Sequence, residues 1–383
     1  MSEFFLHSFN TLSHGLVGYV VPFLFVLTIV VFFHELGHFL VARWAGVKVL
    51  TFSLGFGPEL VGFNDRHGTR WKISAVPLGG YVRFFGDDSE ASTPSAEALS
   101  NMTDEERAGS FHHKKVGPRA AIVAAGPIAN FILAVVIFAA VFAFFGKPNM
   151  SARVDGVEAG SAAETAGFQV GDVVTAIDHQ PIETFPDMQW IVGGHPGQQL
   201  AFTVKRGNST VELYGTPQLK EVKDGFGNVH RLGVLGISRK SLPDDVVTEP
   251  VDPATAVWLG VKETWLVIDQ TLTYVGRVFT GREPADQIGG PIGIAKISGQ
   301  VATLGLVPLI RLAALLSVSI GLLNLFPVPL LDGGHLLFYA VEAIRGRPLS
   351  DRAQEVGFRI GVGLVLMLMV FATYNDILHL TAS

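Results

Sequence analysis

Four stretches of this sequence are each long and apolar enough to cross a lipid bilayer. They cover about residues 16–42, 120–145, 306–325 and 356–374. The hydrocarbon core of a bilayer is roughly 30 Å thick, and a helix needs about 20 residues to cross it. The composition agrees, because 49% of the 383 residues are hydrophobic, only 16% are charged and mean hydropathy is +0.40. We therefore predict an α-helical polytopic membrane protein with four transmembrane helices.

Charge and cysteine content exclude several classes of protein. The net charge of -6 provides no basic surface for nucleic acid, so we expect no nucleic-acid partner. There is no cysteine, which excludes disulfides and thiolate metal sites and leaves histidines and carboxylates as the available metal ligands. No Lys or Arg precedes the first apolar run and no small-residue cleavage site follows it, so we expect that run to remain as a span.

Lysine and arginine residues near the span ends predict the orientation of the chain, because cytoplasmic loops carry an excess of them. Lysines and arginines are frequent around the connector between the first and second spans and the connector between the third and fourth spans. They are Arg43, Lys48, Lys114, Lys115, Arg119, Arg345, Arg347, Arg352 and Arg359. The opposite side has Lys147, Arg153, Lys296 and Arg311. We expect residues 44–118 and 332–355 to be cytoplasmic and both termini to be outside. In a Gram-negative cell this means the inner membrane, with the connector after the second span in the periplasm.

The connectors differ in character. Within 51–85, Trp71 and Ile73 alternate with Lys72 and Ser74, which is the pattern of a strand, and Gly and Pro residues supply turns. Residues 86–110 are rich in Asp, Glu, Ser and Ala and predict a mobile acidic loop. Residues 152–217 combine short strands with an Ala-rich helical segment and predict a small α+β domain, followed by a polar linker at 218–252.

The segment after this linker predicts a helix that lies in the membrane interface. Its apolar residues recur at helical spacing on one face, at Val257, Val261, Trp265, Ile268 and Leu272. Trp258 and Trp265 suit the boundary between lipid and water.

The string HELGH at 34–38 carries the strongest chemical signal. His34 and His38 are four residues apart and therefore share one helix face, where two imidazoles can bind one zinc ion. Glu35 is placed to act as a general base. The alternative is that the HExxH pattern occurs here by chance and has no function. The motif lies inside an apolar span, however, where ionisable residues are costly and are functional by default.

A catalytic zinc site takes a third protein ligand and keeps one position open. Asp332, in NLFPVPLLDGG, is the candidate, because it follows the third span at the depth expected for the HELGH motif. Pro327 and Pro329 interrupt the helix there, so a side chain can turn inward. The sequence leaves two alternatives: Asp332 as a turn residue, and His335 as the ligand instead.

These motifs together resemble the site-2 protease family of intramembrane zinc metalloproteases, of the M50 type. HELGH in the first span, NLFPVPLLDGG in the third, and GPIANF at 126–131 narrow the resemblance to the bacterial regulator-of-sigma-E protease subgroup. The resemblance implies one zinc ion per chain on His34, His38 and Asp332, with Glu35 as the catalytic base. It also implies a substrate contact at Asn324 and suggests a second at Asn130, where an amide that packs helices is the alternative.

The resemblance extends to the soluble parts. Residues 152–217 are similar to a PDZ domain. This domain is present once, whereas the best-known enterobacterial members of the family carry two in tandem. It either gates substrates or serves as a spacer. Residues 51–85 resemble the family's membrane-associated β-hairpin, and GGPIGI at 289–294 matches a family loop without an evident chemical role.

The implied activity is regulated intramembrane proteolysis of single-pass membrane proteins. An anti-sigma factor after a first ectodomain cut is the expected substrate, together with remnant signal peptides. A catalytically silent PDZ membrane scaffold is the alternative, and a metal transporter is a third possibility.

The predicted layout is 1–50 first span with HELGH; 51–118 cytoplasmic hairpin and acidic loop; 119–146 second span; 150–240 periplasmic PDZ domain and linker; 253–300 interfacial amphipathic helix and loop; 305–331 third span; 332–355 cytoplasmic connector; 356–376 fourth span.

Overall fold

The structure is a computed structural model, and it describes residues 2–87, 102–149, 151–223, 229–239, 247–281, 285 and 289–382. The chain divides into two compact units. The first comprises Met1–Val141 and Pro253–Thr381, and the second comprises Phe142–Asp252 with Ala382–Ser383.

Four helices contain the apolar stretches, as predicted. They are α1 (Ser2–Trp44), α4 (Val116–Phe145), α9 (Leu306–Asn324) and α11 (Asp351–Ala382). Their span-length segments are Val17–Trp44, Val116–Phe145, Leu306–Asn324 and Arg352–Leu378. Each is at least 19 residues long, which is close to the roughly 20 residues that a bilayer requires. The chain is therefore a multi-pass membrane protein.

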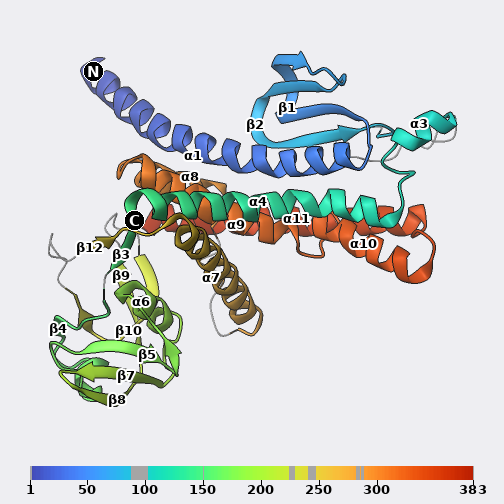
Figure 1. Cartoon of the computed structure of the whole chain (residues 1–383). Coiled ribbons are helices and arrows are strands. Elements are labelled where there is room, and N and C mark those ends of the chain that lie inside the picture. Colours follow the sequence, from blue (N-terminus) through green and yellow to red (C-terminus); the bar gives the residue numbers. More distant parts are fainter. Residues whose placement is uncertain are drawn as a thin grey trace. The chain divides into compact units, whose positions relative to one another are not determined.

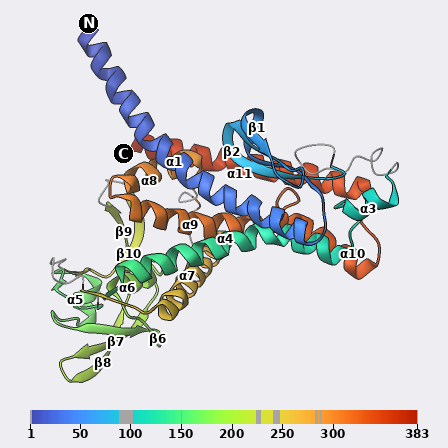
Figure 2. The same cartoon turned by 45° about the horizontal axis from the view of Figure 1, so that its top comes forward.

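These helices approach one another closely at small residues. The backbone carbonyl of Ala125 in α4 lies against Gly37 of α1, and Ser317 of α9 donates a 2.9 Å hydrogen bond to the carbonyl of Asn130 in α4. Helices α4 and α9 lie side by side in both views (Figure 1 and Figure 2). Small residues at such contacts are typical of helix packing inside membranes. As a result, α4 lies beside the part of α1 that carries the HELGH motif.

The hairpin of the first unit consists of β1 (Val49–Asn64) and β2 (Arg70–Phe84), which pair antiparallel. It lies along the C-terminal half of α1 (Figure 1). The core beneath it contains Phe39 of α1 and Phe52 and Val82 of the strands. This confirms the strand predicted around Trp71 and Ile73.

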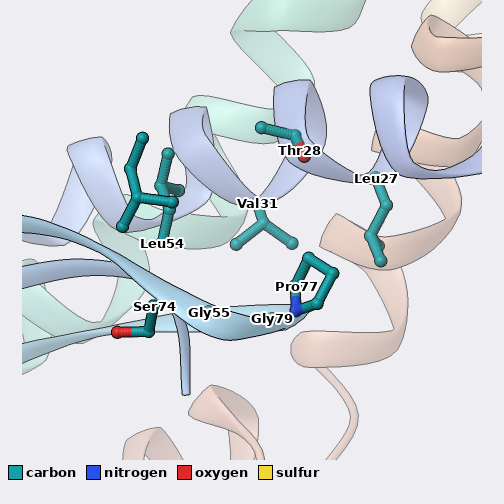
Figure 3. A pocket seen from close by; sticks show the side chains of 9 residues that line it. Leu27, Thr28, Val31, Leu54, Gly55, Ser74, Pro77 and Gly79 are labelled. Atoms are coloured by element: carbon teal, nitrogen blue, oxygen red, sulfur yellow. The ribbon is translucent and has the colours of Figure 1, made fainter. Parts of the chain in front are cut away.

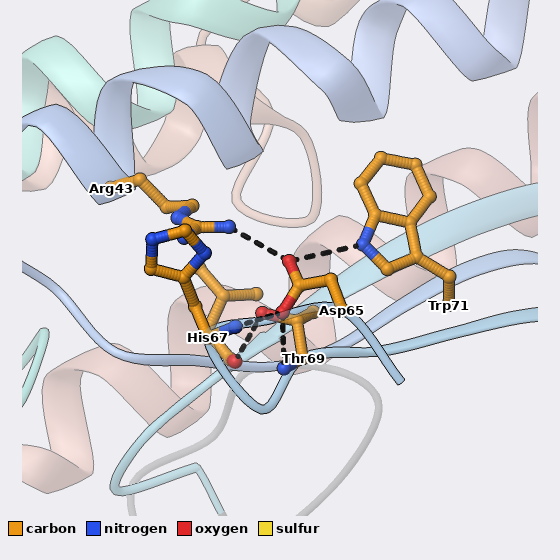
Figure 4. Close-up of polar contacts among 6 residues, drawn as sticks. Arg43, Asp65, His67, Thr69 and Trp71 are labelled. Carbon is orange, nitrogen blue, oxygen red and sulfur yellow. Dashed lines mark hydrogen bonds and ion pairs between the residues drawn. The ribbon is translucent and has the colours of Figure 1, made fainter. Parts of the chain in front are cut away.

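The turn of the hairpin is fastened to the end of α1 by Asp65. Its carboxylate accepts hydrogen bonds from Arg43 at 2.8 Å, from the amides of His67 and Thr69 at 2.8 and 2.9 Å, and from Trp71 at 3.4 Å (Figure 4). Burial alone would raise the pKa of Asp65, but these hydrogen bonds and the Arg43 charge lower it overall. The carboxylate stays ionised and holds the hairpin on α1.

Several shorter helices were not predicted. They are α3 (Asp104–Gly109), α8 (Pro291–Ala302) and α10 (Asp332–Arg345). In α3, Thr103 and Glu106 form a capping box, a local signal that was present in the part of 86–110 interpreted as an acidic loop. Residues 88–101 of that predicted loop lie outside the described residues. The cytoplasmic connector predicted at 332–355 is in large part the amphipathic helix α10.

The GGPIGI segment binds a carboxylate. Asp376 of α11 is 4% exposed and accepts hydrogen bonds from the amides of Gly290, Ile292 and Gly293 at 2.9, 3.0 and 2.9 Å. These amides lie at the start of α8, where unpaired N–H groups and the helix dipole favour an anion. Asp376 therefore caps a helix that precedes it by more than eighty residues.

Helix α7 (Pro253–Phe279) has the two faces that the sequence predicts. Its small residues face inward, and Gly260 lies against the backbone of α4 at Val135 and Ala139. Trp258 and Trp265 are exposed at 66% and 68%. This apolar exposed face fits a helix at a membrane surface.

The second unit is an α+β domain. Its main sheet has the order β6-β5-β7-β8, and its core includes Val174, Phe202 and Val204. Its elements are β3 (Lys147–Asn149), β4 (Gly156–Val157), α5 (Ala162–Ala166), β5 (Val173–Ile177), β6 (Gln180–Pro181), α6 (Phe185–Gly193), β7 (Leu200–Arg206), β8 (Ser209–Gly215), β9 (Gln218–Lys223), β10 (Val229–Val234), β11 (Ile237–Ser238) and β12 (Val247–Glu249).

The interpretation of 218–252 as a linker was wrong for its described residues. Strands β9 and β10 pair antiparallel, and β11 pairs with β4 near the start of the domain. Half of the twelve residues of β9 and β10 are polar, which obscured the strands in the sequence, although five Leu and Val residues occur within them. The folded domain therefore extends past the predicted boundary at 217.

Candidate metal centre

Three predicted ligands come together from two helices distant in sequence. His34 and His38 lie one helical turn apart on α1, and Asp332 is the first residue of α10. The loop 325–331 between α9 and α10 contains Pro327 and Pro329, which prevent α9 from continuing. The chain therefore turns, and α10 starts beside the histidines.

The spacing of the three ligand atoms suits a tetrahedral zinc ion. His34 Nε2 lies 3.2 Å from His38 Nε2 and 3.2 Å from Asp332 Oδ2, and His38 Nε2 lies 3.5 Å from that oxygen. Zinc binds such atoms at about 2.0–2.2 Å, which places tetrahedral ligands about 3.3 Å from one another. The three distances match that value, so one ion can reach all three atoms.

The environment of Asp332 Oδ2 supports the same conclusion. This oxygen is buried, and no described donor forms a hydrogen bond of good geometry with it. An unpaired buried carboxylate oxygen is costly. The side chains of both histidines are only 12% exposed and that of Asp332 is 17% exposed. The residues present therefore fit a bound metal, which would complete the coordination of this oxygen.

The outer nitrogens of both imidazoles have partners on α4. His38 Nδ1 lies 2.9 Å from the carbonyl oxygen of Ile122, to which it can donate its proton, leaving Nε2 free for a metal. His34 Nδ1 lies 3.3 Å from the Asn130 side-chain nitrogen, and Oδ1 of Asn130 is buried with no hydrogen-bond partner among the described residues. Exchange of the two amide atoms, which are interchangeable by assignment, would give His34 Nδ1–H an acceptor and satisfy Oδ1.

Gly126 of α4 provides the space that the imidazoles need. A Cβ atom at this position would lie 2.3 Å from Nε2 of His38 and 2.9 Å from Cε1 of His34. Contacts under 3.0 Å are essentially never seen for real Cβ atoms. The glycine of GPIANF is therefore required beside the ligands.

Glu35 lies under the hairpin. It is only 9% exposed, and a Cβ atom at Gly80 of β2 would lie 3.0 Å from its Cγ. The absence of a side chain at Gly80 brings the strand backbone close to the carboxylate. The predicted general base is therefore adjacent both to the predicted ligands on its own helix and to a strand.

The remaining predicted residues are placed as follows. Asn324 is the last residue of α9, before the turn toward Asp332, and is partly buried. His335, the alternative ligand, lies one turn further along α10, outside the metal-binding group formed by His34, His38 and Asp332. Asn130 contacts His34.

Sequence reasoning did not identify Ile122 or Gly126 as parts of this centre. Any residue can supply a backbone carbonyl, so Ile122 has no sequence signal. The Gly126 signal was available, since the residue opens the GPIANF motif, but its role depends on the distance between two helices.

Comparisons with known proteins agree with this geometry. Residues 22–368 match the family model described as Peptidase family M50. A protein of Agrobacterium fabrum named for zinc metalloprotease activity is 53% identical over 362 residues, which cover 94% of this chain and 96% of that protein. The Metalloprotease MmpA of Caulobacter vibrioides is 40% identical over 385 residues, with coverage of 95% and 96%.

A solved structure is similar to a shorter part of the chain. It is the PDZ domain of an SdrC-like protein from Listeria monocytogenes, with 18% identity, coverage of 27% of this chain and 97% of that one, and a TM-score of 0.19.

Proposed function

Since this chain belongs to peptidase family M50 and is a zinc metalloprotease, we propose that it cuts single-pass membrane proteins within or near their membrane-spanning helices. One observation carries the proposal. The ligands His34 and His38 and the base Glu35 lie inside the span-length segment Val17–Trp44 of α1. A peptide bond must reach that depth to be cut.

The roles of the residues follow from their positions. His34, His38 and Asp332 would hold zinc, which when bound supplies a Lewis acid that makes water more acidic and polarises a carbonyl group. Glu35 accepts the proton of the attacking water and passes it to the amine that leaves. The Ile122 carbonyl orients His38, and the Asn130 amide orients His34.

Substrate handling is the second part of the proposal. The peptide bonds of a helical substrate are shielded by their own hydrogen bonds, so the segment must unwind before it is cut. The hairpin β1–β2 lies against Glu35 through Gly80, and a strand there can pair with an extended chain. Asn324 is proposed to contact the substrate backbone. Asn130 is proposed to share that contact through the amide atom that is not directed at His34.

Location and partners extend the proposal. From the charge bias we propose that residues 44–118 and 332–355 lie in the cytoplasm of a bacterial cell. The active site then lies toward the cytoplasmic side of the inner membrane, and the second unit lies in the periplasm. The second unit is proposed to be a single PDZ domain that gates substrates. An anti-sigma factor whose ectodomain has been trimmed is the proposed substrate, and remnant signal peptides are a further class.

The test is cleavage of a tagged single-pass substrate co-expressed with the full chain. Glu35→Gln should abolish cleavage and retain zinc, because the amide cannot accept the proton while all three ligands remain. Glu355→Gln, on an exposed i,i+4 pair of α11, should cleave as the parent does. Equal cleavage by Glu35→Gln and the parent would refute the proposed function with Glu35 as its general base.

A further inference from the structure

A cavity lies between α1 and the hairpin, close to the general base (Figure 3). Side chains of α1 form one wall, and β1 and β2 form the other. It is lined by Leu27, Thr28, Val31, Leu54, Gly55, Ile73, Ser74, Pro77 and Gly79.

The cavity and Glu35 share both of their walls. Val31 precedes Glu35 by four residues and therefore lies on the same face of α1. Gly80 of β2 lies against both Val31 and Glu35, since a Cβ atom at Gly80 would lie 2.9 Å from Cγ1 of Val31 and 3.0 Å from Cγ of Glu35. A chain that runs between α1 and the hairpin past Glu35 would therefore also pass this cavity.

The lining selects for an apolar group. Most lining residues are aliphatic, and the buried hydroxyl of Ser74 is 3.1 Å from that of Ser53, which also bonds the Gly55 carbonyl at 2.9 Å. These hydroxyls are already paired, so they create little demand for a polar ligand. The volume of the cavity is about 80 Å³. One water molecule needs about 10–15 Å³ by the same measure, so the cavity has room for one side chain and not for a larger ligand.

The distance from Glu35 indicates which substrate residue would enter. With a rise of about 1.5 Å per helical residue, Val31 and Leu27 lie about 6 and 12 Å along α1 from Glu35. An extended chain advances about 3.3 Å per residue. The cavity is therefore two to four residues away from a bond cut beside Glu35.

We propose that this cavity is a specificity subsite, occupied by one apolar side chain of the extended substrate two to four residues from the cut bond. This inference rests on the proposed proteolytic function and names the residue class that it reads. Ile73 and Thr28 set the size of the subsite: both line it and both are exposed, so they can be changed with little effect on the core.

The experiment uses the full chain reconstituted in liposomes with a single-pass substrate whose cut bond is mapped by mass spectrometry. Each of four residues on either side of the bond is replaced in turn by Ala, Leu and Phe, and relative kcat/KM is measured. The enzymes are the parent, Ile73→Ala to enlarge the cavity, Thr28→Phe to fill it, and Leu78→Ala as control. Leu78 is on the same strand as Ile73 and equally exposed, at 54% against 53%, but does not line the cavity.

At one substrate position, Ile73→Ala should raise the preference for Phe over Ala by about tenfold, and Thr28→Phe should lower it by about tenfold, since a methylene or more in an apolar pocket is worth at least that factor. Leu78→Ala should behave as the parent. Two results would overturn the subsite and leave the proposed proteolytic function intact. One is an unchanged preference at every position, which an acyl chain in the cavity would produce. The other is an equal change of preference in Leu78→Ala. If Glu35→Gln cleaves as well as the parent, the proposed function fails and the subsite fails with it.

Discussion

Replacing Gly126 by alanine should remove zinc from the protein without unfolding it. The added Cβ atom would lie 2.3 Å from His38 Nε2. To reach the 3.0 Å limit for real contacts, the imidazole must move by at least 3.0 − 2.3 = 0.7 Å. Zinc–ligand distances tolerate only about 0.2 Å. The displaced nitrogen therefore cannot remain a ligand in the same site.

Movement of α4 offers no easier solution. If the helix withdrew by the same 0.7 Å, the 2.9 Å contact from His38 Nδ1 to the Ile122 carbonyl would lengthen beyond hydrogen-bond range. Loss of such an orienting partner typically lowers metal affinity about 10- to 100-fold. We expect Gly126→Ala to weaken zinc binding by at least that factor.

The assay is competition for zinc between the purified protein and a chromophoric chelator, together with zinc content per chain after dialysis. Gly117→Ala is the matched control, because it adds the same methyl group to the same helix. There the new Cβ atom would have no described atom within 4 Å beyond its chain neighbours and the backbone of its own helix. Gly117→Ala should bind zinc as the parent does. Parent-like zinc affinity in Gly126→Ala, in a chain that folds, would refute the reasoning about the space beside the ligands.

Three further experiments test other parts of the structure. Asp332→Ala should lose zinc while His335→Ala retains it, as measured by metal content per chain, and the reverse result would exchange their roles. Burial alone would raise the pKa of Asp172, but hydrogen bonds from Arg206 and the Gln169 amide lower it overall. The ionised carboxylate therefore stabilises the second unit at pH values above the pKa that Asp172 has in the unfolded chain. Asp172→Asn should lower local stability by about 2 kcal/mol at pH 7, and this deficit should shrink as pH falls below about 4, as measured by hydrogen exchange in β7. Asp376→Ala should leave three amides without their acceptor and speed hydrogen exchange at 289–293, and unchanged exchange there would contradict the cap.

The sequence predicted the elements whose signals are local. A span is a run of apolar residues, a strand such as that at Trp71 and Ile73 shows alternation, and HELGH places two ligands on one helix face by spacing alone. Each of these patterns can be recognised in a window shorter than thirty residues. All of them have counterparts in the structure.

What the sequence did not predict depends on contacts between distant segments. The amides of Gly290, Ile292 and Gly293 are indistinguishable in sequence from any other amides, so nothing marked them as the partners of Asp376. The strands β9 and β10 carry many polar residues, and pairing with each other rather than burial makes them strands. Helix α10 was obscured because its start, Asp-Gly-Gly, has the composition of a turn.

The cap formed by Asp376 also has a consequence for the biogenesis of the protein. The amides at the start of α8 are synthesised 83 to 86 positions before the carboxylate that accepts their hydrogen bonds. Helices α9, α10 and most of α11 must be synthesised in between, and the last of the four spans must be inserted. During that interval the start of α8 has no acceptor from α11. The start of α8 therefore reaches its final conformation only after the last span has been inserted.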